Sequence, residues 1–226
     1  MSKRLKSTLI LITMLMSSVL FPVFTYAKPF ETRTYLDLSV IWPVSKKTGS
    51  HIKLGPFVRE ESRFRKSGLH YVKSFIGMRT SFLPWFRIAA YYAHKDFPKS
   101  SKPQAHMAVL DAFFDVNAGP VVFTDKNGLE VHITDGFFRY RNALVVRYKT
   151  PLHWFDLFAK EEFRVDSDAA RVNMLDFWSG ILMRFFQKQK AKLSLKIFYG
   201  YETKRRNKPT WQGGVHLLGI ELKAKL

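Results

Sequence analysis

The stretch ITDGFFRYRNALVVRYK, from Ile133 to Lys149, alternates between apolar and charged side chains along most of its length. One set of alternate positions holds Phe138, Tyr140, Leu144, Val146 and Tyr148, with Asn142 among them. The other set holds Arg139, Arg141, Arg147 and Lys149, with Ala143 and Val145. Successive side chains of a β-strand point to opposite faces, so this period of two predicts a strand with one apolar and one charged face. The class of the protein therefore depends on which medium lies on each side of the sheet.

The same alternation recurs along the rest of the chain. It gives about eleven or twelve candidate strands, separated by short segments with turn-forming residues. Among these breaks, Asp125–Gly128 is predicted to be a hairpin turn, because Asn-Gly supplies the positive φ that such a turn needs. No stretch shows a helical period of useful length. The sequence therefore predicts an all-β fold.

The length of the runs separates a sheet in water from a sheet in lipid. Strands of soluble proteins average about 5–6 residues, whereas a strand that crosses a bilayer needs about 9–11. The runs Gly136–Thr150 and Arg171–Phe186 are longer than either value. A soluble sandwich, with its apolar faces packed inward, also alternates. Length, the signs of export and the aromatic content together favour an antiparallel up-and-down transmembrane β-barrel.

The closed form and the strand count follow from the same reasoning. Lipid offers no hydrogen-bond partners, so the first and last strands must pair. We predict about 12 strands, with 10 as the alternative, because an even number places both chain ends on the periplasmic side. The last strand carries apolar residues at every second position back from Leu226, as in the terminal assembly signal of bacterial outer-membrane barrels, where the last residue is usually Phe.

The first 27 residues have the pattern of a secretory signal peptide. Lys3, Arg4 and Lys6 precede the apolar run Leu9–Phe21, and Thr25–Ala27 resembles a cleavage site. An uncleaved membrane helix is the alternative, but the apolar run is short for a span. We therefore predict a signal peptide over residues 1–27 and a single β-barrel domain over residues 28–226. The chain has no cysteine, which favours a bacterial envelope protein over a disulfide-bonded secreted domain.

The charge of the chain points to polyanionic partners. The formal net charge is +19, and the expected mature chain keeps +16 because the first 27 residues carry three basic and no acidic side chains. Anionic lipid, acidic polysaccharide and nucleic acid would all match this charge. Export makes nucleic acid an improbable partner. We expect contact with the lipid bilayer and, through basic loop clusters such as Thr203–Lys208, with lipopolysaccharide.

Aromatic residues cluster near the ends of the expected strands. This placement is typical of the girdles that membrane barrels present at the two lipid–water interfaces, although ordinary strand packing could also produce it. The residues concerned are Trp42, Phe82, Trp85, Tyr92, Tyr148, Trp154, Tyr201 and Trp211.

Two groups of residues in the sequence resemble parts of catalytic sites. His132 and Thr134, with Asn142 nearby, resemble the His, Ser and Asn of outer-membrane phospholipases, but Thr replaces Ser and a turn at Asp135-Gly136 separates the pair from Asn142. Glu161 and Glu162 are adjacent on a strand, so they point to opposite faces, Glu162 into the lumen and Glu161 outward near a rim. The histidines lack metal-ligand spacing. The sequence predicts no enzyme and no cofactor.

The inward-facing charges are the main candidate site. Two interpretations apply: a lumen cross-linked by ion pairs, or a basic pore or pocket for small anionic solutes. The candidate residues are Arg139, Arg141, Arg147, Lys149, Glu162, Arg164, Asp176, Arg184, Lys196 and Glu202.

Five segments of the C-terminal half carry a resemblance to a known family. They are DGFFRYRNALVVRY, FDLFAKEEFRV, RVNMLDFWSGILMRF, LSLKIFYGYE and GVHLLGIELKAKL. Together they resemble the domain-of-unknown-function family twenty-four-ninety, whose members are bacterial outer-membrane-type β-barrel proteins. The likeness covers residues 129–226 and is looser before them. It implies the barrel fold and the outer membrane, and it brings no established activity.

These observations lead to one preferred function and two alternatives. We expect an outer-membrane β-barrel that serves as a small channel with a basic lumen or as an envelope-structural protein. The alternatives are an outer-membrane hydrolase that acts on lipid acyl chains and a soluble periplasmic lipid-binding β-barrel.

Overall fold

The computed structural model describes residues 30–39, 42–43, 52–98, 101, 103–168, 171–185, 192–204 and 212–225. The predicted signal peptide, Trp211, Leu226 and the basic segment 205–208 lie outside these residues. No helix among them is long and apolar enough to cross a membrane.

The described chain is made entirely of β-strands and turns, which confirms the all-β prediction. The strands are β1 (Phe30–Ser39), β2 (Trp42–Pro43), β3 (Lys53–Arg65), β4 (Gly68–Leu83), β5 (Phe86–Asp96), β6 (Ala105–Ala118), β7 (Val121–His132), β8 (Phe137–Lys149), β9 (Phe155–Asp166), β10 (Arg171–Phe185), β11 (Lys192–Lys204) and β12 (Gln212–Lys225). From β3 to β12 each strand pairs antiparallel with the next.

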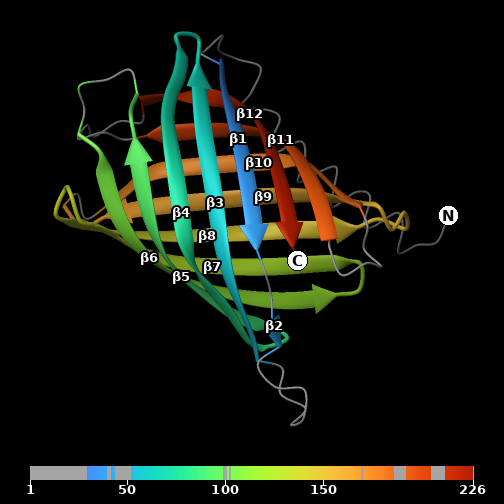
Figure 1. Ribbon diagram of the computed structural model, residues 1–226. Helices are drawn as coiled ribbons and strands as arrows, with labels where there is room; N and C mark the ends of the chain where they lie inside the picture. Colours follow the sequence, from blue (N-terminus) through green and yellow to red (C-terminus); the bar gives the residue numbers. More distant parts are fainter. Residues whose placement is uncertain are drawn as a thin grey trace.

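Strand β1 closes the sheet into a barrel. It pairs antiparallel with β3 on one side and parallel with β12 on the other. Figure 1 shows β1 and β12 side by side with their arrowheads pointing the same way. The first and last strands therefore do pair, as predicted.

The strand count and the purely antiparallel arrangement were wrong. Eleven strands, β1 and β3 to β12, form the closed barrel, while the two-residue β2 only extends the pairing with β3. An odd number follows directly from the parallel closure, because β1 and β12 both run from the same end of the barrel to the other. We call these ends the Phe30 end, where β1 begins, and the Ser39 end, where it stops.

The two faces of the sheet differ as the opening stretch predicts. In β8, Phe138, Tyr140 and Leu144 are exposed on the outside, whereas Ala143 is buried and Arg139 and Arg141 point inward. In β1, Leu36 and Leu38 are exposed and Asp37 between them is buried. Period-two alternation thus directs charge into the barrel and apolar side chains away from it.

The turn predicted at Asp125–Gly128 does not exist, because these residues lie inside β7. Gly128 pairs with Asp111 on β6 and with Arg141 on β8. A Cβ at Gly128 would lie 2.5 Å from Asp111 Oδ1 and 2.7 Å from Arg141 Nε. This glycine therefore makes room for an ion pair that crosses β7. Gly119 and Gly136, with φ of 62° and 70°, do lie in turns.

Several of the predicted girdle residues gather at the Ser39 end. Phe82 stacks on Phe86, Phe86 on Phe114, and Trp85 on Phe114, with ring centroids 5.1–6.5 Å apart. Trp154 packs against Phe155 at the same end of the barrel, at the start of β9. Tyr92 and Tyr201 lie toward the Phe30 end, where each contacts a histidine.

Candidate functional site

Among the described residues, two cavities open in the lumen, one toward each end. The first, of about 650 Å³, reaches the turns of the Phe30 end, and the second, of about 470 Å³, lies toward the Ser39 end. The described residues that line the first cavity include twelve basic and seven acidic side chains, and those that line the second include four basic and two acidic ones. Both cavities are therefore net basic.

An aromatic layer lies between the cavities. Tyr35, Phe158, Trp178 and Phe198 form one buried cluster, in which Trp178 and Phe198 stack with centroids 4.8 Å apart. Tyr35 and Trp178 line the Phe30-end cavity, Phe158 lines the other, and the two cavities share no described lining residue. The aromatic layer therefore lies between the two cavities, on the wall formed by β1, β9, β10 and β11.

The backbone of neighbouring strands is adapted to this layer. Phe198 pairs with Gly180 on β10 and with Gly219 on β12. A Cβ at Gly219 would lie 1.9 Å from the Phe198 ring, and one at Gly180 would lie 2.9 Å from Phe198 Cβ. Glycine on both sides leaves space for the ring to lie flat against the inner wall.

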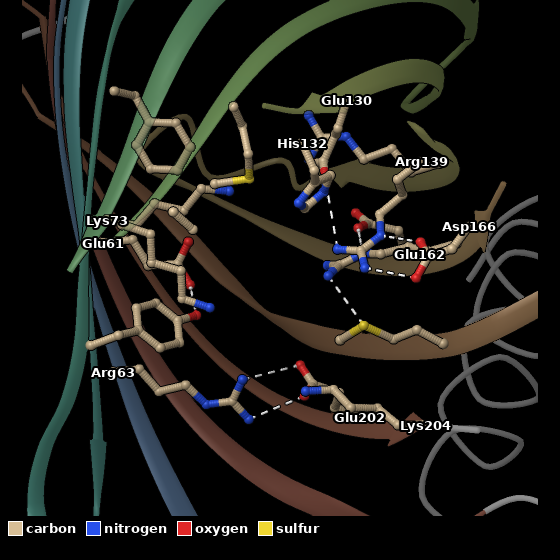
Figure 2. Close-up of a pocket in the computed structure, with 18 of the residues that line it drawn as sticks. Glu61, Arg63, Lys73, Glu130, His132, Arg139, Glu162, Asp166, Glu202 and Lys204 are labelled. Atoms are coloured by element: carbon tan, nitrogen blue, oxygen red, sulfur yellow. Dashed lines mark hydrogen bonds and ion pairs between the residues drawn. The ribbon is translucent and has the colours of Figure 1, made fainter. Parts of the chain in front are cut away.

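Glu202 is the centre of the first ion-pair cluster. Its carboxylate accepts hydrogen bonds from Arg33 and Arg63 and forms an ion pair with Lys204 at 2.7 Å. Arg63 also pairs with Glu31. Figure 2 shows Arg63 reaching across to Glu202, so that this cluster ties β3 to β11.

Glu162 and Asp176 form a second cluster beside the first, because Asp176 on β10 is the register partner of both Glu162 on β9 and Glu202 on β11. Arg164 donates to Glu162 at 2.7 Å and to Asp176 at 2.9 Å, and Lys160 pairs with Glu162. Lys160 also lies 4.1 Å above the Trp178 ring. Asp176 is fully buried, and its Oδ1 atom has no hydrogen-bond partner.

Arg139 and Arg141 belong to a third cluster. Arg141 contacts Asp111 at 2.8 Å and Glu130 at 3.1 Å, while Arg139 forms a two-pronged pair with Asp166. All five side chains of this cluster are buried or half-buried. These contacts link β6, β7, β8 and β9.

The remaining predicted residues lie near the Ser39 end. Arg147 and Arg184 both contact the buried carboxylate of Asp156. Lys196 pairs with Glu221 at 3.5 Å and lies 4.2 Å above the Phe158 ring. Lys149 is exposed at the end of β8, where it contacts Asn117 rather than the lumen.

The ten candidates thus do not form a single site. Six lie on the side of the Phe30-end cavity, namely Arg139, Arg141, Glu162, Arg164, Asp176 and Glu202, and four lie toward the Ser39 end. The ten candidates do not include the inward charges of the N-terminal strands, although the same alternation marks them. They include Arg33, Arg59, Arg63, Lys73, Arg79, Lys95, Asp111 and Glu130.

The three residues that resemble a phospholipase site are not brought together. His132 points inward and contacts Glu130, Thr134 lies in a turn and accepts a hydrogen bond from the backbone of His106, and Asn142 is on the outer face. A hydroxyl nucleophile needs a base within hydrogen-bond reach, and the described side chains place none beside Thr134. They also contain no group of three residues arranged to hold a metal ion.

A polar patch interrupts the outer face, which also carries the exposed carboxylate of Glu60 on β3. Asn142 donates to Asp125 at 2.7 Å and to Asn127 at 3.1 Å, and Asn127 also donates to Asp125. Glu161 is exposed beside this patch, level with Leu144 in the register of β8 and β9. It faces outward as predicted, but it lies in the middle of β9 and not near a rim.

We compared the chain with protein-family models and with curated proteins, and no family model and no curated protein matched it.

Proposed function

We propose that this chain spans a bacterial outer membrane as a β-barrel and holds small anions in its net-basic lumen. One observation carries the proposal, namely the inverted distribution of side chains. Twenty-eight large apolar side chains are exposed among the described residues, while eleven Asp, Glu and Arg side chains are buried. A protein in water buries the first kind and exposes the second. Hydrocarbon outside and ion pairs inside would satisfy both.

Strand length and closure support the same proposal. Ten of the eleven barrel strands have 11–16 residues and β1 has 10, which suits a tilted crossing of the bilayer core. The closed hydrogen-bond ladder leaves no edge for lipid to solvate. The aromatic cluster of Phe82, Trp85, Phe86 and Phe114 would serve as an interfacial girdle at the Ser39 end.

Two features depart from the common pattern. Single-chain bacterial barrels usually have an even number of strands, although odd-stranded membrane barrels exist in mitochondria. Glu60 and Glu161 are exposed on the outer face, and the outer patch of Asp125, Asn127 and Asn142 places further polar groups in the apolar band. Its amides and carboxylate bond to one another, which lowers the cost of removing them from water.

The divided lumen favours a pocket over an open pore. The aromatic cluster lies between two cavities that share no described lining residue, and we infer that a solute enters one cavity without a continuous path to the other. An envelope-structural role is the second candidate, because ion pairs between distant strands, such as Arg63 with Glu202, cross-link the walls. A lipid carrier in water would instead need an apolar lumen.

Extraction and gel migration test the membrane assignment. We expect the mature protein to resist extraction of bacterial envelopes by alkaline carbonate, to dissolve in detergent, and to migrate faster on gels before boiling than after it. Release by carbonate without detergent would contradict the proposal.

Membership of the domain-of-unknown-function family twenty-four-ninety stays a prediction of the sequence.

A further inference from the structure

Three basic side chains of the Phe30-end cavity differ from all the others that line it. Nine of the twelve basic side chains there form ion pairs: Arg33, Arg63, Arg65, Lys126, Arg139, Arg141, Lys160, Arg164 and Lys204. Arg59, Lys73 and Lys95 have no ion pair with any described residue, and all three come from the adjacent strands β3, β4 and β5. The unpaired positive charge of the cavity is therefore gathered on one wall.

The register of the strands places two of these cations face to face. Lys73 on β4 pairs with Lys95 on β5, and both side chains line the cavity. Directly opposed residues on neighbouring strands have Cβ atoms about 4.5–5.5 Å apart, and like charges in that position repel. Arg59 lies two residues farther from the Phe30 end than this level, opposite Phe75. Repulsion between the two ammonium groups is unfavourable, and an anion bound between them would relieve it.

Aromatic rings, rather than carboxylates, support these cations. The Lys95 ammonium lies 4.0 Å from the Tyr71 ring centroid and 4.8 Å from that of Phe97. The Lys73 ammonium lies 4.9 Å from the Phe75 ring, and the Arg59 guanidinium lies 4.6 Å from the Tyr35 ring. Cation–π contacts hold a cation in place without neutralising it, so its charge remains available to a ligand.

The one carboxylate on this wall is already engaged. Glu61 is level with Lys73 in the register, yet it makes no ion pair with a described residue and accepts a hydrogen bond from the Tyr71 hydroxyl at 2.6 Å. Figure 2 shows Glu61 and Lys73 together on this wall, facing the paired clusters of Glu162, Asp166 and Glu202. Three unpaired cations against one carboxylate leave the wall net positive.

We propose that this wall binds a phosphate monoester, with Lys73 and Lys95 as direct ligands of its phosphate and Arg59 at the inner side. A dianion with three terminal oxygens can accept hydrogen bonds from two ammonium groups at once. The cavity of about 650 Å³ is much larger than one phosphate and falls within the range of small-molecule sites. Tyr35, Phe75 and Trp178 would contact an apolar or aromatic body attached to the phosphate. This inference deepens the proposed function and rests on it.

Titration calorimetry in detergent micelles tests the site. The probes are phenyl phosphate, short-chain phosphatidic acid and, as a neutral analogue of the first, phenol. We expect phenyl phosphate or phosphatidic acid to bind and phenol not to bind. If phenyl phosphate binds, the natural ligand is a water-soluble phosphate monoester. If only phosphatidic acid binds, the natural ligand is a lipid with a phosphate headgroup. If neither phosphate binds at millimolar concentration, the proposal is wrong.

Substitutions locate the site. Lys73→Gln and Lys95→Gln should each lower the affinity at least about tenfold, and Lys149→Gln, which removes an exposed charge at the Ser39 end, should leave it unchanged. Equal affinities in all variants would place the phosphate elsewhere and overturn the proposal.

A measurement on the unmodified chain serves if a variant fails to fold. Lysine acetylation is mapped by mass spectrometry with and without the bound phosphate. We expect the phosphate to protect Lys73 and Lys95 from acetylation and to leave Lys149 unprotected. If it protected neither of the two cavity lysines, the site would be contradicted. Because micelles replace the membrane here, failure of phosphate binding is distinguishable from failure of the membrane assignment, which extraction tests separately.

Discussion

The Phe198 ring on β11 occupies the space that a side chain at Gly219 on β12 would need. A Cβ at position 219 would lie 1.9 Å from the ring, and the tight inner wall leaves the ring little room to move. We expect Gly219→Ala to lower the free energy of unfolding by about 1–3 kcal/mol, as overpacking does in cores. Urea unfolding in micelles, followed by tryptophan fluorescence, measures it.

A double-substitution cycle separates this contact from a general loss of stability. When Phe198→Ala removes the ring, adding Gly219→Ala should cost almost nothing more. Gly119 is the control, because its φ of 62° penalises alanine through the backbone and not through Phe198. Its cost should therefore be the same with and without the ring. Simple additivity at Gly219 would show that the ring does not occupy that space.

Glu202 should be among the most sensitive charged positions. Replacing it with Gln removes the partner of the buried Arg33 guanidinium and one of the two partners of Arg63. Loss of one member of a buried pair costs about 3–5 kcal/mol, and we expect Glu202→Gln to lower the free energy of unfolding by that order.

Arg65→Gln is the matched control for Glu202→Gln. Arg65 pairs with Glu31 but its side chain is 41% exposed, and exposed pairs contribute about 1 kcal/mol or less. Comparable losses for the two substitutions, in the same unfolding experiment, would contradict the buried lumen cluster.

The parallel pairing of β1 with β12 can be tested by cross-linking, because the chain has no cysteine of its own. Leu36 and Leu222 are register partners, both exposed on the outer face. Neighbouring strands lie about 4.8 Å apart, within the reach of a disulfide. We expect Leu36→Cys with Leu222→Cys to form a disulfide on oxidation, seen as a mobility shift on non-reducing gels.

The control pair for the cross-link is Leu36→Cys with Leu218→Cys. Leu218 is the partner of Thr32, four residues along the strand from the partner of Leu36, which corresponds to about 13 Å. It should not cross-link. If the control pair formed a disulfide efficiently and the pair at positions 36 and 222 formed none, the barrel would close in another register or direction.

The aromatic layer should keep the lumen closed to ions. In planar bilayers we expect no steady conductance from the unmodified protein and anion-selective conductance after Trp178→Ala with Phe198→Ala, because both cavities are net basic. Tyr140→Ala, which removes an exposed aromatic ring from the outer face, should stay closed. Equal conductance before and after removal of the two rings would show that they do not divide the lumen.

Much of the architecture could be predicted from the sequence because side-chain alternation reports directly on the two faces of a strand. The inward direction of Arg139, Arg141 and Glu162 and the outward direction of Leu144 follow from it. Alternation carries no information about strand direction, so the parallel partner of β1 and the odd strand count could not be inferred. The role of Gly128 could not be inferred either. Its Asn-Gly sequence is typical of a turn, but the glycine is needed because Asp111 and Arg141 on the neighbouring strands occupy the space of a side chain there.

The site was harder to predict, because pairing depends on register between strands far apart in the sequence. Glu202 is 139 residues from Arg63, and only the closed barrel brings them together. For the same reason nothing in the sequence separates Lys73 and Lys95, which lack ion pairs, from Lys126 and Lys160, which have them.

Spin labels at two adjacent positions of β8 test the membrane assignment most directly. Leu144 is exposed on the outer face, and Val145 lines the cavity of the Ser39 end. In protein reconstituted into lipid vesicles, a label at position 144 should collide with dissolved oxygen, which concentrates in hydrocarbon, and be shielded from a water-soluble nickel complex. A label at position 145 should show little contact with oxygen. If the nickel complex reached position 144 as freely as it reaches a label in water, the outer face would be wetted by water and the account would be wrong.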